Sequence, residues 1–191
     1  MSDISFNIKN YIEEPIINEF GFREYDARWI YPKQINLNGI KKLGYGLGQL
    51  MIEENVKKEI VIGHDYRSYS EEVKNALVSG LLSYGINVFD VGLTISPGAY
   101  FSQYDLDCKS VAMVTASHNE NGWTGFKMGV NRPLTFGPDL MKRLKEICLN
   151  DLSPKKINGK YTYIEGMNAK YIDDLTKRNN IKRKIKAVVA C

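Results

Sequence analysis

Apolar residues along this chain follow two alternating patterns, one typical of helices and the other typical of strands. Between Asn36 and Asn55 they recur every three or four residues, which predicts an amphipathic helix with its N-cap at Asn36 or Asn38. The same spacing predicts four further helices: 70–85, a short helix from Ser96-Pro97, 138–149 and 171–178. A serine is the predicted N-cap of the first two, Ser70 and Ser96. Short apolar runs predict strands at 60–62, 86–91, 111–115 and 125–130. Strands that alternate with helices indicate an α/β layered fold with a partly parallel sheet.

The pattern divides the chain into four stretches. Residues 1–20 show no period and are interpreted as an N-terminal arm, and residues 21–150 hold the predicted strands and most of the helices. Residues 151–184 have the serine, proline, glycine and lysine content of a connector. The apolar run 185–191 predicts one more strand, which we interpret as the start of a truncated second domain.

Composition narrows the class of protein. The 191 residues are 43% apolar and 25% charged, which is ordinary globular usage and excludes a disordered or fibrous chain. No apolar run reaches the length of about 18 residues that a membrane helix needs, and the first ten residues lack the pattern of a secretory signal. The widely spaced Cys108, Cys148 and Cys191 favour a reducing, cytoplasmic location. The net charge of +4 does not call for nucleic acid, and the basic stretch 177–186 lacks the interleaved aromatic residues that stack on bases.

The loop that follows the predicted strand 111–115 carries the strongest chemical signal. Its sequence is Thr115-Ala116-Ser117-His118-Asn119. Small neighbours let another group approach the Ser117 hydroxyl, and His118 and Asn119 can donate to phosphate or oxyanion oxygens. The alternative is a polar turn between two strands. Ser117 beside His118 does not define a catalytic triad, because geometry rather than sequence adjacency makes one.

Two other loops are charged. Gly63-His64-Asp65-Tyr66-Arg67-Ser68 follows the first predicted strand and is interpreted, taken alone, as a structural turn with an Asp–Arg pair. The run Phe22-Arg23-Glu24-Tyr25-Asp26-Ala27-Arg28 holds two arginines that could grip a phosphate, although its alternating pattern also suits an edge strand. Each signal is weak alone, and the combination decides the interpretation.

Together these motifs resemble the α-D-phosphohexomutase family, which includes phosphomannomutase and phosphoglucomutase. The similar segments are Phe22-Arg23-x-Tyr25-Asp26-x-Arg28, Gly63-x-Asp65-x-Arg67, the Ser117 loop and Gly125-Phe126-Lys127, in the family's order over roughly 20–150. Two departures stand out. Tyr69 occupies the place of a usual serine, and Glu120-Asn121 stands where the commoner family loop has a proline, a change expected to loosen that loop.

The resemblance implies a fold and a set of roles. The fold is a three-layer α/β/α sandwich around a mixed, mostly four-stranded sheet. Ser117 would be the phosphorylated serine and Lys127 the general acid/base, while His118 and Arg28 would stabilise the transferring group. Tyr25 and Asn119 would help to bind substrate.

The implied activity is reversible transfer of phosphate between the 1- and 6-positions of a hexose phosphate, mannose or glucose phosphate. It would proceed through a bisphosphorylated sugar, and a glucose 1,6-bisphosphate-type activator would phosphorylate the serine. Mg²⁺ is the expected metal, held by the phosphate on Ser117 and by ligands outside this chain. The family's further C-terminal domains would complete the site, so the chain alone is expected to be inactive. Two alternatives remain open: a non-catalytic phosphosugar-binding module and a serine hydrolase that uses Ser117.

Overall fold

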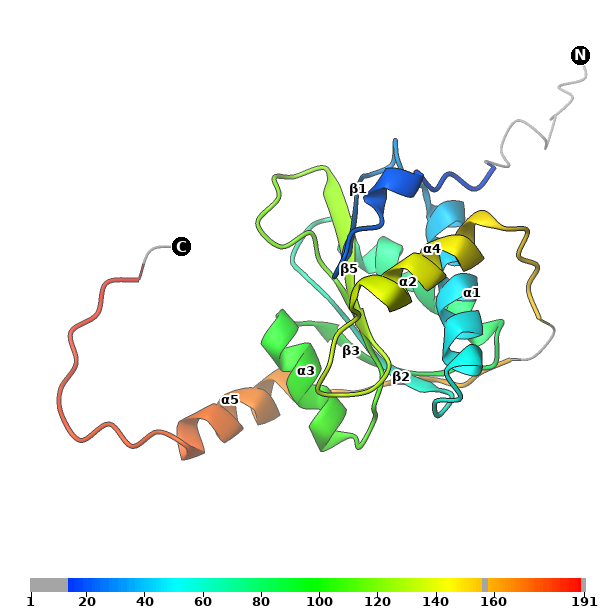
Figure 1. Cartoon of the computed structure of the whole chain (residues 1–191). Helices are drawn as coiled ribbons and strands as arrows, with labels where there is room; N and C mark the ends of the chain where they lie inside the picture. The colour runs from blue at the N-terminus through cyan, green and yellow to red at the C-terminus, as the bar shows by residue number, and fades with distance from the viewer. Residues whose placement is uncertain (1–13, 156–157, 190–191) are drawn as a thin grey trace, which may run out of the picture.

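A six-stranded mixed sheet with helices on both faces forms the structure (Figure 1). The computed structural model describes residues 14–155 and 158–189. In chain order the elements are the 3-10 turn η2 (Glu19–Gly21), β1 (Ala27–Ile30), α1 (Leu37–Glu53), β2 (Glu59–His64), α2 (Ser70–Leu82), β3 (Asn87–Leu93), α3 (Ser96–Asp105), β4 (Val111–Val114), β5 (Trp123–Gly129), α4 (Pro138–Leu149), β6 (Tyr161–Tyr163) and α5 (Met167–Lys177).

The strand order is β1-β5-β4-β2-β3-β6. Strands β4, β2, β3 and β6 are parallel, whereas β5 is antiparallel to both of its neighbours. The four inner strands are the four that the apolar runs predict. The α/β class is therefore confirmed, and the count of four strands is corrected to six because a short strand is added at each edge.

Three layers follow from the alternation of side chains along the strands. One face of the sheet packs against α1, α2 and α4, with Trp29, Ile62, Val114 and Phe126 in its core. The other face packs against α3, with Val61 and Met113 beneath the helix, and α5 contacts α3. Figure 1 shows α3 and α5 on one side of the sheet and the remaining helices on the other.

The predicted N-caps agree with the structure in one case and differ in two. Asn36 caps α1 as predicted, since its Oδ1 accepts a hydrogen bond of 2.8 Å from the backbone of Gly39. Ser70 and Ser96 are not caps; they are the first residues of α2 and α3, whose N-caps are Tyr69 and Ile95. The Ser70 hydroxyl instead donates to Asp65, so that serine fastens the loop before the helix.

A buried ion pair anchors the edge of the sheet that the sequence does not predict. Lys74 of α2 lies 2.6 Å from Asp90 of β3, and their side chains are 4% and 0% exposed. The Tyr161 hydroxyl of β6 donates to the same carboxylate at 2.8 Å. The segment interpreted as a connector therefore contributes the unpredicted strand β6 to this sheet. The helix predicted at 171–178 is present as α5, which begins four residues earlier, at Met167.

The predicted terminal strand is not formed within the described residues, and its interpretation as the start of a second domain stays a prediction. Residues 178–189 contain no strand, and residues 190 and 191 lie outside the described part. A strand needs a partner that offers backbone hydrogen bonds, and none of the described residues pairs with this stretch. Residues 1–13 of the predicted arm also lie outside the description, whereas Ile17 forms a bridge with Ile35. Within 14–155 and 158–189, every helix is too short or too polar to cross a membrane.

Candidate active site at the carboxyl edge of the sheet

Ser117 lies in the loop 115–122, which joins β4 to β5 at the edge where the parallel strands end. Its backbone has a φ of 56°, a left-handed conformation that costs a residue with a side chain about 1–2 kcal/mol. The Thr115 hydroxyl accepts a hydrogen bond of 3.0 Å from the Ser117 N–H and supports this turn. Ser117 is exposed, and its hydroxyl has no hydrogen bond within the described residues. The hydroxyl is thus presented to solvent by a strained and supported backbone.

Arg28 reaches this loop from two strands away. On β1 it lies opposite Gly125 of β5, and β5 separates β1 from β4. A Cβ at position 125 would lie 3.1 Å from the Arg28 Cγ, so the absence of a side chain lets Arg28 pass over β5. Its Nη1 donates to the side-chain oxygen of Asn119 at 2.5 Å, and its Nη2 lies 2.7 Å from Asp26. Asp26 therefore fixes the arginine that holds Asn119.

Arg67 holds the loop from the opposite side. Its Nη2 donates to the backbone oxygen of Asn119 at 2.5 Å and to that of Ser117 at 3.3 Å. Its Nη1 donates to Asp65, whose other oxygen accepts from the Ser70 hydroxyl. The predicted Asp–Arg pair is present, and it also orients Arg67 toward the serine loop.

The predicted site residues differ in how closely they approach the cluster formed by the serine loop, Arg28 and Arg67. Arg28, Ser117 and Asn119 are brought together directly, and His118 projects from the same loop, exposed and without a side-chain hydrogen bond among the described residues. Lys127 lies on β5 between two residues of the α1-side core, so strand alternation places it on the other face, where Arg28 and Gly125 lie. It too has no ion pair within 14–155 and 158–189.

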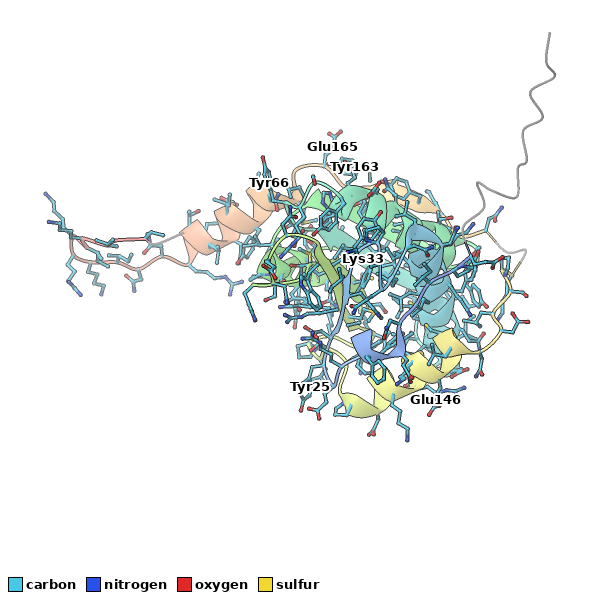
Figure 2. The ribbon with its side chains drawn as sticks, turned by 90° about the horizontal axis from the view of Figure 1, so that it is seen from above. Tyr25, Lys33, Tyr66, Glu146, Tyr163 and Glu165 are labelled. Atoms are coloured by element: carbon cyan, nitrogen blue, oxygen red, sulfur yellow. The ribbon has the colours of Figure 1, made fainter. Side chains whose placement is uncertain are left out.

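Tyr25 stays apart from the cluster. It lies in the turn before β1, its side chain is 62% exposed, and Figure 2 shows it at the periphery of the molecule. Asn119 is engaged by both arginines, a role that the sequence did not suggest. Sequence reasoning also missed Arg67 as part of the site, and it missed Tyr69, whose hydroxyl accepts a hydrogen bond of 2.8 Å from the backbone N–H of Gly122 at the end of the serine loop. The signal that could have found Arg67 is its motif, Gly63-x-Asp65-x-Arg67, in order before the serine loop.

The geometry does not support the serine hydrolase. The chain contains two histidines, His64 and His118, and neither contacts the Ser117 hydroxyl. His64 Nδ1 instead donates to the backbone oxygen of Asp65 at 3.0 Å. A hydrolase triad needs a histidine that accepts the serine proton, and this chain provides none in that position.

Carboxylates for a divalent cation are likewise not clustered here. Residues 14–155 and 158–189 contain no group of three or more histidine, cysteine, aspartate or glutamate side chains suited to a metal ion. The described residues therefore do not form a Mg²⁺ site on their own.

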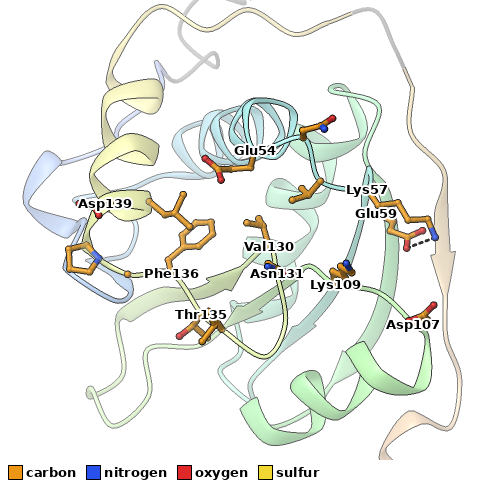
Figure 3. Close-up of a pocket in the computed structure, with 16 residues that line it drawn as sticks. Glu54, Lys57, Glu59, Asp107, Lys109, Val130, Asn131, Thr135, Phe136 and Asp139 are labelled. Carbon is orange, nitrogen blue, oxygen red and sulfur yellow. Dashed lines mark ion pairs between the residues drawn. The ribbon is translucent and has the colours of Figure 1, made fainter.

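A cavity lies at the opposite end of the strands from Ser117, where the parallel strands begin (Figure 3). It has a volume of about 770 Å³ and lies between the end of α1, the start of β2 and the segment that leads from β5 into α4. Lys57 and Glu59 form an ion pair of 2.7 Å on its wall. None of the predicted site residues lines it.

Comparison with known proteins identifies this arrangement. Residues 19–155 match the family model described as phosphoglucomutase/phosphomannomutase, alpha/beta/alpha domain I. The phosphomannomutase of Vibrio cholerae is 30% identical over 157 residues, which are 81% of this chain and 34% of that protein. The phosphomannomutase of Escherichia coli K12 is 32% identical over 167 residues, or 84% of this chain and 35% of that protein.

Solved structures give the same fold. A phosphoglucomutase/phosphomannomutase family protein from Burkholderia thailandensis superposes with a TM-score of 0.78 at 23% identity, over 88% of this chain and 38% of that one. The fold and its serine loop thus define an α/β/α domain of the mutase type. This chain belongs to the phosphoglucomutase/phosphomannomutase family, and residues 19–155 correspond to its domain I. The chain spans about a third of the length of the curated relatives that it matches.

Proposed function

We propose that the protein containing this chain is a phosphohexomutase, which moves phosphate between the 1- and 6-positions of a hexose phosphate by way of phospho-Ser117. The observation that carries the proposal is the exposed Ser117 on a left-handed backbone, in a loop held by Arg28 and Arg67. Two guanidinium groups at the loop supply the positive charge that a transferring phosphoryl group needs, and His118 and Lys127 lie nearby on the chain.

The proposed step transfers the phosphoryl group from the Ser117 oxygen to a free sugar hydroxyl. The bond between phosphorus and the serine oxygen breaks, a bond to the sugar oxygen forms, and the hydroxyl proton passes to Lys127, which acts as the general base. The bisphosphorylated sugar then reorients and returns its other phosphate to Ser117, while Lys127 gives back the proton. Arg28 and His118 stabilise the transferring group, and Tyr25 and Asn119 assist substrate binding.

The remaining parts of the proposal concern what lies outside this chain. Mg²⁺ would be held by the Ser117 phosphate together with ligands from the rest of the protein, and a glucose 1,6-bisphosphate-type activator would load the serine. The substrate is mannose or glucose phosphate, in keeping with relatives that are named phosphomannomutases and phosphoglucomutases. A cytoplasmic location accords with the free, buried Cys108 and Cys148.

A turnover assay on the complete protein tests the proposal. Conversion of glucose 1-phosphate and of mannose 1-phosphate to the 6-phosphates is measured with Mg²⁺ and the activator. Ser117→Ala should abolish turnover, and Lys127→Met should lower kcat about 100-fold because proton transfer is lost. The 191-residue chain alone should give no turnover. If the wild-type protein binds hexose phosphate without converting it, the activity assigned here is wrong and the domain is a binding module.

A further inference from the structure

The loop 115–122 is held differently in its two halves. Arg28 and Arg67 bind only its first half, at backbone or side-chain atoms of residues 116, 117 and 119. The second half contains Glu120 and Asn121, where the family resemblance leads one to expect a proline and a stiffer chain. Something else must fix the second half if Ser117 is to keep one position.

Tyr69 supplies that contact. Its hydroxyl donates to the backbone oxygen of Trp123 at 2.9 Å and accepts from the backbone N–H of Gly122 at 2.8 Å. A phenol can do both at once, because it has one proton and free lone pairs. Gly122 has a φ of 94°, so the loop reverses direction at the residue that the hydroxyl holds. The oxygen of Gly122 accepts a further bond of 2.8 Å from the Tyr31 N–H.

The Tyr69 ring is itself fixed in place. It stacks on the ring of Tyr31, with centroids 5.3 Å apart and planes 28° from parallel. The Tyr31 hydroxyl donates to Glu72 of α2 at 2.7 Å. A ring held on one face and at its hydroxyl has little rotational freedom to lose when it binds the loop.

The turn that precedes α2 therefore binds the serine loop at two places. Arg67 and Tyr69 are two residues apart just before α2, and they bind the first half of the loop and its last residue, Gly122, respectively. A serine at position 69, as in the usual family motif, has a hydroxyl one carbon from its backbone and cannot span the distance that a phenol ring spans. The two departures from the family pattern thus compensate one another: a loop without proline is fastened by a longer side chain.

We propose that Tyr69 is a positioning residue for Ser117, whose hydroxyl fixes the second half of the loop so that phosphoryl transfer is fast. The effect on transfer rests on the proposed function, whereas the fastening of the loop does not. A displaced serine would lower kcat rather than weaken substrate binding, since Tyr69 itself binds only the protein backbone.

The chain provides a closely matched control. Tyr84 is also stacked on another tyrosine, Tyr45, with centroids 5.6 Å apart and planes 29° from parallel. Its hydroxyl also donates to a backbone oxygen, that of Ser153, at 3.0 Å. Neither Tyr45 nor Ser153 belongs to the serine loop. Tyr84→Phe therefore removes the same kind of bond from the same kind of ring, away from Ser117.

The experiment compares wild type, Tyr69→Phe and Tyr84→Phe in the complete protein. Amide hydrogen exchange over 117–123 should become about fivefold faster in Tyr69→Phe only, because both bonds between the Tyr69 hydroxyl and this segment are lost. With glucose 1-phosphate, kcat should fall about tenfold in Tyr69→Phe while KM stays within about twofold, and Tyr84→Phe should match wild type in both.

Two results would overturn the proposal. Exchange over 117–123 that is unchanged in Tyr69→Phe shows that the hydroxyl does not hold the loop. An equal fall of kcat in both variants assigns the effect to general stability. If wild type shows neither turnover nor phosphorylated Ser117, the proposed function fails, and the exchange result still decides whether Tyr69 fastens the loop.

Discussion

The guanidinium of Arg28 and the side-chain oxygen of Asn119 are 2.5 Å apart, although the strand β5 separates β1 from the strand that leads to Asn119. This bond links the outer edge of the sheet to the loop that carries Ser117. A charged donor makes it stronger than a bond between neutral groups. The loop position therefore depends on a contact between residues that are 91 apart in sequence.

Loss of this contact should slow transfer more than it destabilises the fold. In the complete protein, Asn119→Ala removes the acceptor of Arg28, and we expect kcat for glucose 1-phosphate to fall about 10- to 100-fold. Asn87→Ala is the control. Asn87 is the first residue of β3, far from the serine loop, and its side-chain oxygen also accepts a single hydrogen bond, of 2.9 Å, from the backbone N–H of Lys160. Equal kcat values for the two variants would contradict the role given to the Arg28–Asn119 bond.

Gly125 should be intolerant of even one added carbon. A Cβ there would lie 2.6 Å from the backbone oxygen of Ala27 and 2.9 Å from that of Thr115, atoms that cannot move aside without disturbing the sheet. Gly125→Ala should lower the free energy of unfolding by about 1–3 kcal/mol. Gly137→Ser, which places its Cβ in open space at the N-cap of α4, should change it by less than about 0.5 kcal/mol. Urea unfolding of the two variants measures the difference, and equal losses would count against this packing.

The buried Lys74–Asp90 pair should matter far more to stability than a surface pair. Lys74→Met leaves the Asp90 carboxylate buried without its counter-ion, and should cost about 3–5 kcal/mol of unfolding free energy. Arg143→Met breaks a half-exposed pair with Glu53 and should cost about 1 kcal/mol or less. The double variant Lys74→Met/Asp90→Asn should recover part of the loss in a urea titration. No recovery would mean that the lysine acts through its packing rather than its charge.

Attachment of β6 should weaken in alkaline solution. Burial and the hydrogen bond to Asp90 raise the pKa of Tyr161 to about 12 from an ordinary value of 10.0. The unfolded chain ionises this phenol at lower pH than the folded one, so the stability it contributes is present below pH about 10 and is lost between pH about 10 and about 12. Unfolding midpoints of wild type and Tyr161→Phe, measured across that range, should converge as the pH rises. A constant difference would show that Tyr161 does not titrate in the folded protein as described.

The sequence predicted the parts of this structure that depend on local pattern. Helix α1 with its cap at Asn36, helix α4 and the four inner strands follow from apolar spacing, because each buries one continuous face. The three-residue strand β6 is too short to show a period, and it is held by backbone pairing with β3 and by the bond from Tyr161 to Asp90, which are distant in sequence.

The residues of the candidate site that belong to sequence motifs could be predicted, whereas the contacts between them could not. The motifs located Ser117, His118 and Arg28, and the structure places the first and last of these in one cluster. Spacing along the chain could not reveal that Arg67 and Tyr69 bind the serine loop, since those contacts depend on how β2 and β4 are paired and on where α2 begins. The same limit applies to Asn119. Its residue type suggested a donor to a bound ligand, whereas in the structure its side-chain oxygen accepts a hydrogen bond from Arg28.

The central claim is that Ser117 carries the phosphoryl group. It is tested most directly by intact-mass and fragment-mass analysis of the complete protein after incubation with glucose 1,6-bisphosphate and Mg²⁺. We expect a single added phosphate located on Ser117, its loss on addition of hexose monophosphate, and no addition in Ser117→Ala. A phosphate that persists in Ser117→Ala, or a wild-type protein that takes up none, would contradict the claim.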